Sequence, residues 1–274
     1  MTQTDSSQPH IVARPRLGLV IFFVIAFGVP WVGWIAVRKT VGLNHMLDSF
    51  SLYWFTAAPS IAGFVAAFAQ DGWMGLRAFA ERVFNLRFAF RIWIAALLLP
   101  LLAAALTFAT HPADLLRGGT PHFTELLAAV TWMNFFTGPI AEEFGWRGYL
   151  LGRLCRRFHP ALAGLLIGPI WAAWHIPLFY DSVFAHLNSA GGYVVWVTAW
   201  SVILALIVAK ARGSVLPSIL GHWAANAAPS FFFALLPALP GEHQPGGWAF
   251  SVASAVVAAA FAWQWRDTGW QFTE

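Results

Sequence analysis

The chain alternates between long apolar stretches and short polar connections along almost its whole length. A transmembrane helix needs about 20 consecutive, mostly apolar residues. Eight stretches approach that length, and the fourth is short because it runs directly into two glutamates. The pattern predicts an all-α, polytopic membrane protein with about eight transmembrane helices. The predicted spans are residues 17–37, 50–69, 92–109, 126–141, 161–180, 193–209, 215–236 and 247–265.

Two of the polar connections carry a helical pattern of their own. In residues 73–87, apolar side chains recur at near-helical spacing with arginines between them, which predicts an amphipathic helix lying at the membrane interface. Residues 142–158 have a similar pattern and predict a helix that continues from, or kinks off, the fourth span. We expect His159-Pro160 to end it, because the residue before a proline disfavours helical backbone.

The positions of the positive charges test this count independently. If the N-terminus is cytoplasmic and the spans alternate, 13 of the 16 Lys and Arg residues fall in cytoplasmic segments, leaving only Arg38, Lys39 and Arg117 outside. This is the bias that orients membrane proteins. It supports one membrane-embedded domain over residues 17–266, between a disordered cytoplasmic tail (1–16) and a second cytoplasmic tail (267–274). Short loops rich in Ala, Trp and Arg favour a bacterial inner (plasma) membrane.

Composition agrees with a protein whose main partner is the lipid bilayer. Hydrophobic residues make up 59% of the chain and charged residues 10%, against about 25% in soluble domains. The small excess of basic over acidic residues fits the loop bias, so we expect no nucleic-acid partner. Cys155 is the only cysteine, which excludes an intramolecular disulfide and a thiolate metal cage.

Ionisable residues inside apolar segments are energetically expensive and are usually functional. Glu142 and Glu143 end the fourth span, and neighbours on a helix point about 100° apart, so they should have different roles. Arg147 lies four residues after Glu143 and can form an ion pair with it. Glu142 is then free to face the bundle and act as a general base. A salt bridge at the end of a helix explains the group equally well.

Two more polar groups interrupt later spans. His175 follows Trp171 by one helical turn, so the indole can pack against the imidazole, and Pro177 can kink the helix there. His222 and Asn226 are four residues apart and share one helix face. Packing or interhelical hydrogen bonding alone could account for each group. Together with Glu142, these residues supply a carboxylate, two imidazoles and an amide, the groups that a hydrolytic site needs.

These three groups resemble the motifs of the CAAX protease and bacteriocin-processing (CPBP, Abi) family, which includes the type II CAAX prenyl endopeptidases. The family shows Glu-Glu-x-x-x-Arg, then an aromatic residue, usually Phe, three residues before His, and then His-x-x-x-Asn. The matching residues are Glu142, Glu143 and Arg147, Trp171 and His175, and His222 and Asn226. The departure is Trp171 in place of Phe, which keeps an aromatic wall.

The resemblance implies an intramembrane endopeptidase with its active-site cavity open to the cytoplasmic side. It implies that Glu142 and His175 activate water and that His222 and Asn226 stabilise the oxyanion. Arg147 would hold Glu143 and the helix register. The expected substrate is a hydrophobic or prenylated peptide or protein, cut near its C-terminus.

Several alternatives stay open. Metal-free catalysis is favoured because no His-Glu-x-x-His stretch is present, but Glu142, His175 and His222 could form a zinc site and make the enzyme a metalloprotease. The same fold could instead serve as a catalytically inactive immunity or scaffold protein. A small-solute transporter fits less well, since the sequence shows no internal repeat.

Overall fold

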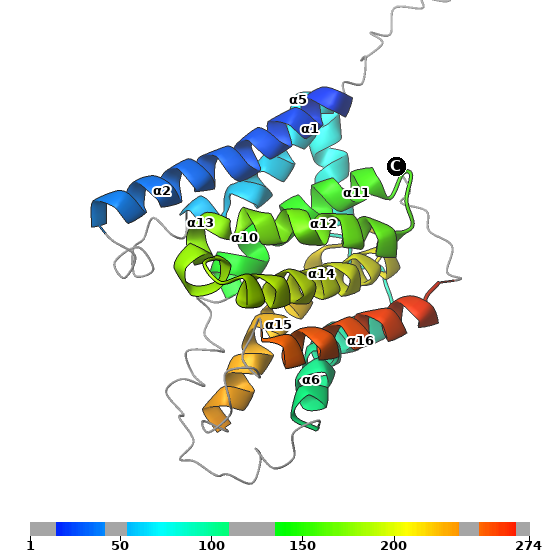
Figure 1. Ribbon diagram of the computed structural model, residues 1–274. Coiled ribbons are helices and arrows are strands. Elements are labelled where there is room, and N and C mark those ends of the chain that lie inside the picture. The colour runs from blue at the N-terminus through cyan, green and yellow to red at the C-terminus, as the bar shows by residue number, and fades with distance from the viewer. Residues whose placement is uncertain (1–14, 42–53, 110–134, 236–246, 267–274) are drawn as a thin grey trace, which may run out of the picture.

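The computed structural model describes residues 15–41, 54–109, 135–235 and 247–266, and all regular secondary structure in these ranges is helical (Figure 1). The all-α prediction is therefore confirmed for the described part of the chain. The helices, with π-helical segments written η, are α1 (Pro15–Phe23), η1 (Val24–Gly28), α2 (Val29–Val41), α5 (Ala58–Val83), α6 (Arg91–Ala109), η2 (Phe136–Ile140), α10 (Ala141–Glu143), η3 (Phe144–Leu150), α11 (Leu151–Leu154), α12 (Pro160–Trp174), α13 (Ile176–Phe179), η4 (Tyr180–Phe184), α14 (Leu187–Lys210), α15 (Leu216–Leu235) and α16 (Trp248–Gln264).

Helix length and apolarity identify an integral membrane protein. Among the described residues, three helices are long and apolar enough to cross a bilayer, namely Arg16–Thr40, Arg91–Ala109 and Leu187–Lys210. A fourth span results if α12 and the bent segment Ile176–Phe184 are counted together. The prediction of about eight spans is thus not confirmed. Most of the predicted fourth span, residues 126–134, lies outside the described residues.

The two predicted connecting helices are present with modified ends. α5 runs on from the second predicted span through the amphipathic segment to Val83, and it is broken where Asp71 and Gly72 leave helical geometry. Gly72 has φ +61°, a conformation that glycine adopts without steric cost. The second helix continues from Glu142 to Leu154 rather than to Phe158. The domain boundaries stay a prediction, since residues 1–14 and 267–274 lie outside the described ranges.

α14 runs through the middle of the bundle and packs against α12 on one side and α16 on the other (Figure 1). Two glycines of α12, Gly164 and Gly168, bring the α12 and α14 backbones together. A Cβ on Gly164 would lie 2.7 Å from Cα of Val202, and one on Gly168 would lie 2.5 Å from Cα of Thr198. Small residues four apart allow this close approach in membrane helices.

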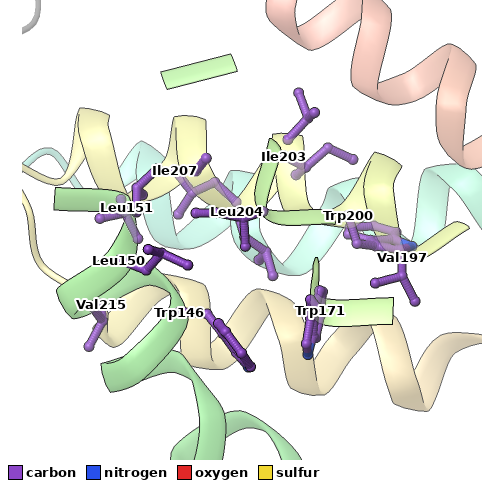
Figure 2. Packing of buried hydrophobic residues seen from close by; sticks show 14 of the residues in the cluster. Trp146, Leu150, Leu151, Trp171, Val197, Trp200, Ile203, Leu204, Ile207 and Val215 are labelled. Atoms are coloured by element: carbon purple, nitrogen blue, oxygen red, sulfur yellow. The ribbon is translucent and has the colours of Figure 1, made fainter. Parts of the chain in front are cut away.

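Large apolar side chains from different helices fill the space around α14. Figure 2 shows the α14 residues Trp200, Leu204 and Ile207 close to side chains from η3, α11 and α12. Trp146 of η3 and Leu151 of α11 are fully buried in this cluster, and Trp171 of α12 is 5% exposed. This packing fixes η3, which carries Arg147, and α12, which carries Trp171 and ends at His175, against one rigid support.

Backbone contact also fixes the helix that carries the two glutamates. A Cβ added to Gly145 would overlap the carbonyl oxygen of Pro59 in α5, so only glycine fits there. A Cβ on Gly63 of α5 would lie 2.9 Å from the carbonyl oxygen of Phe144. Ser60 adds a hydrogen bond of 2.9 Å from its hydroxyl to the carbonyl oxygen of Ile140. The segment from Ile140 to Gly145 is therefore held directly against α5.

Candidate active site

The polar residues from three separate helices meet at one cavity of about 470 Å³. Glu142, His175, His222 and Asn226 all line it, together with Trp171. Glu143 and Arg147 lie behind this lining and are fully buried. The remaining wall is mostly apolar and aromatic, made by Trp174, Leu178, Phe179, Val183, Tyr193, Trp196, Val197, Trp200, Leu204 and Ala225. The cavity therefore combines a small polar centre with a large hydrophobic wall.

Glu142 is 3% exposed and is held by a neighbouring helix. The indole Nε1 of Trp171 donates a hydrogen bond of 2.5 Å to its Oε2. Its other oxygen, Oε1, faces Gly138 and would lie 3.7 Å from a Cβ built on that glycine. One carboxylate oxygen is thus engaged by the protein, and the other lies toward the polar centre of the cavity.

His175 lies where α12 ends and the chain bends by 50° into α13. The expected kink beside Pro177 is therefore present. The ring Nδ1 of His175 is 2.9 Å from the carbonyl oxygen of Trp171. Because a carbonyl oxygen only accepts hydrogen bonds, Nδ1 must donate, and in the neutral ring Nε2 then carries the lone pair. Phe179 stacks on the imidazole, with ring centroids 5.4 Å apart.

Glu143 connects the first motif to the third. Its Oε1 accepts a hydrogen bond of 2.9 Å from Nη1 of Arg147, which confirms the predicted ion pair. The same oxygen lies 3.0 Å from Nδ1 of His222. An ionised carboxylate only accepts, so the Nδ1 of His222 donates and its Nε2 is directed away from Glu143. Glu143 therefore sets the orientation of His222 as well as pairing with Arg147.

Gly138, just before the first motif, marks the centre of the site and was missed from the sequence. A Cβ built on Gly138 would lie 3.3 Å from Nδ2 of Asn226, 3.5 Å from Nε2 of His222 and 3.7 Å from Oε1 of Glu142. The only signal was its place in Gly-Pro-Ile-Ala, directly before the two glutamates. The wall residue Tyr193 was missed too, because an aromatic residue near the start of an apolar span is ordinary.

In the described part of the chain, no group of three or more His, Cys, Asp and Glu side chains is arranged to hold a metal ion. Glu142 Oε2 and the Nδ1 atoms of both histidines already bond to protein groups. In these three residues, Oε1 of Glu142 and the two Nε2 atoms are therefore the ones left to coordinate a zinc ion.

Comparison with known proteins bears on the same stretch of chain. Residues 124–228, which contain all seven motif residues, match the family model described as type II CAAX prenyl endopeptidase Rce1-like. The site segment is therefore similar to the Rce1-like family. This confirms the resemblance that the three motifs indicated.

A curated relative supports the Rce1-like match. It is CAAX prenyl protease 2 of Methanococcus maripaludis, 29% identical over 96 residues. The aligned part covers 31% of this chain and 34% of the relative, so the chain spans about a third of the length of the curated protein it matches.

Proposed function

We propose that this protein is an intramembrane endopeptidase that hydrolyses a peptide bond near the C-terminus of a lipidated or hydrophobic peptide or protein. The observation that carries the proposal is the convergence of Glu142, His175, His222 and Asn226 on one largely apolar cavity. The Rce1-like match over residues 124–228 supports the same activity. Other membrane proteins bury polar residues, but this set has the separate donors, acceptors and base that amide hydrolysis requires.

Glu142 is the proposed general base, and His175 orients the nucleophile. A water molecule between them donates one hydrogen to the carboxylate and the other to Nε2 of His175, which directs an oxygen lone pair at the scissile carbonyl carbon. Glu142 takes the proton as the C–O bond forms and the carbonyl π electrons move onto oxygen. When the tetrahedral intermediate collapses, the C–N bond breaks and Glu142 returns the proton to the leaving amine.

Asn226 and His222 are the proposed oxyanion donors. Asn226 Nδ2 and His222 Nε2 both approach the position that a Cβ on Gly138 would take, so they can reach one oxygen atom. His222 donates through Nε2 only as an imidazolium, because Nδ1 already donates to Glu143. The Glu143 carboxylate stabilises that imidazolium at 3.0 Å. Donors that are already in position stabilise the oxyanion without any cost of reorganisation during the reaction.

The cavity wall supports a hydrophobic substrate. Trp174, Phe179, Tyr193, Trp196 and Trp200 offer aromatic surface beside the polar centre. A prenyl chain or an apolar peptide tail fits such a wall because it is removed from water and makes dispersion contacts on binding. We propose a prenylated C-terminal peptide as the first substrate to test.

The proposed topology has eight spans, both termini on the cytoplasmic side, and a bacterial inner membrane as the location. Positive charge gathers at one end of the helices, with Arg82 at the end of α5, Arg153 in α11 and Lys210 at the end of α14. Arg38 lies at the opposite end and binds Asp181 at 2.6 Å. This separation is what the positive-inside rule expects.

The decisive experiment uses purified protein in liposomes with two peptides of one sequence, one farnesylated on a cysteine near its C-terminus and one unmodified. Wild type is expected to cut the farnesylated peptide faster. Glu142→Gln keeps the side-chain shape without the base and is expected to lose about 100-fold or more in kcat while unfolding at the wild-type temperature. Equal cleavage by wild type and Glu142→Gln would reject the proposal, as would failure of wild type to cut either peptide.

A further inference from the structure

Trp171 is bonded to both groups that the proposed mechanism places on the attacking water. Its indole N–H donates to Oε2 of Glu142 at 2.5 Å. Its main-chain carbonyl accepts from Nδ1 of His175 at 2.9 Å. Glu142 and His175 come from different helices, and Trp171 bonds to both. Trp171 therefore fixes the position of the proposed general base relative to the imidazole.

The end of α12 explains how the carbonyl of Trp171 reaches an imidazole. In a regular α-helix this oxygen would accept from the backbone N–H of residue 175. Here the N–H of His175 bonds instead to the carbonyl of Ala172 at 3.1 Å, which tightens the last turn. The carbonyl of Trp171 is then available to the His175 side chain, and the bend into α13 begins at the same residue.

The indole ring itself is held from two sides. The guanidinium carbon of Arg147 lies 4.0 Å from the ring centroid, over its face. The imidazole of His222 meets the ring edge-on, with centroids 5.1 Å apart. Trp171 is 5% exposed, so the ring cannot swing into solvent. The N–H therefore points at Glu142 from a fixed platform.

We propose that Trp171 is a positioning residue that selects Oε1 of Glu142 as the catalytic base and places it relative to His175. This rests on the proposed function. Oε2 is engaged by the indole, and Oε1 is the oxygen that lies near Gly138, His222 and Asn226. A phenylalanine at this position would keep an aromatic wall and the stacking with Arg147, but it has no N–H to give. The indole donor is thus a feature that an aromatic wall alone does not supply.

The test separates the N–H from the ring. Trp171→Phe removes the donor, and replacing Trp171 with the benzothienyl analogue of tryptophan changes only N–H to sulfur and keeps the bicyclic shape. Hydrogen bonds to charged groups are typically worth about 1.5–3 kcal/mol. We expect kcat to fall about 10- to 100-fold in both, with KM for the farnesylated peptide within about twofold of wild type. Trp31→Phe is the matched control, because its N–H bonds to the carbonyl of Trp174 at 3.1 Å and does not contact Glu142 or His175.

The outcomes distinguish this inference from the proposed function. If wild type is active and Glu142→Gln is not, but both Trp171 variants keep kcat within about twofold, Trp171 only packs and the inference is wrong. If kcat falls in Trp171→Phe but not in the benzothienyl variant, the ring shape matters rather than the donor, and the inference again fails. If Glu142→Gln is as active as wild type, the proposed function has failed regardless of Trp171.

Discussion

Glu143 and His222 are 79 positions apart in the chain, yet Oε1 of Glu143 lies 3.0 Å from Nδ1 of His222. The same oxygen holds Arg147, so one buried carboxylate stands between two groups that are cationic or can become so. Glu142 adds a second acid in the same region. Two carboxylates, one guanidinium and one protonated imidazole balance to zero net charge. The proposed oxyanion role of His222, which requires an imidazolium there, would thus leave this buried cluster without net charge.

The Glu143–Arg147 pair gives a prediction about stability. Breaking a buried pair from one side leaves an uncompensated charge and typically costs about 3–5 kcal/mol. We expect Glu143→Gln and Arg147→Gln each to lower the unfolding temperature in detergent strongly. The double variant should be more stable than the sum of the two single effects predicts. Additive losses in this thermal-unfolding cycle would mean that the two groups are not coupled.

Gly138 gives a prediction about space in the site. Gly138→Ala would put a methyl group 3.3 Å from Nδ2 of Asn226 and 3.5 Å from Nε2 of His222, where the oxyanion is proposed to form. We expect kcat to fall about 100-fold or more, with little change in unfolding temperature. Gly28→Ala is the matched control, since a Cβ there meets nothing within 4 Å. Normal turnover by Gly138→Ala would place the reacting oxygen elsewhere.

Metal dependence can be decided with stripped protein. Metal-free hydrolysis predicts that protein treated with a strong chelator and assayed in chelator keeps its full rate, because water is activated by Glu142 and His175. Adding zinc to the stripped protein should bring no gain. Complete loss on stripping, restored by stoichiometric zinc, would instead make Glu142, His175 and His222 ligands.

The single cysteine makes the topology testable. In a Cys155→Ser background, Lys39→Cys and Arg157→Cys each carry one thiol, at opposite ends of the predicted spans. A membrane-impermeant maleimide added to intact cells should label Lys39→Cys only, and permeabilised cells should show both. Labelling of Arg157→Cys in intact cells would reverse the orientation. The readout is a mass shift on a gel, and total thiol in detergent is the control.

Much of the helix layout could be predicted from the long apolar segments. In lipid, the backbone polar groups of such a segment must be hydrogen-bonded within the protein, and an α-helix achieves this within one segment. Residues 17–37 correspond to α1–α2, and 92–109 to α6, within a few residues. The span count was less certain, because α5 and α15 mix apolar with polar positions and do not qualify as spans by length and composition.

The candidate site residues were selected from their positions in apolar segments and from the family resemblance, but most of their hydrogen-bond partners could not be predicted. The ion pair of Glu143 with Arg147 is local and follows from the four-residue spacing. The bond from Glu143 to His222 joins distant helices and has no sequence signal. Trp171 was expected to act as an aromatic wall, whereas its N–H to Glu142 depends on how α12 is rotated against α10. Such rotations are set by packing, including the contacts of Gly164 and Gly168 with α14.

The hydrogen bonds of the site join residues at very different sequence separations, and this affects the order in which they can form during synthesis. The Glu143–Arg147 pair closes within one turn, so this stretch can enter the bilayer with two of its three charges already neutralised. Glu142 and His222 receive their partners only when α12 and α15 have also been inserted. The polar residues that line the cavity therefore come together only after most of the chain has left the ribosome. Under the proposed function, a nascent chain stalled before residue 222 would lack both oxyanion donors and would not hydrolyse the membrane proteins around it.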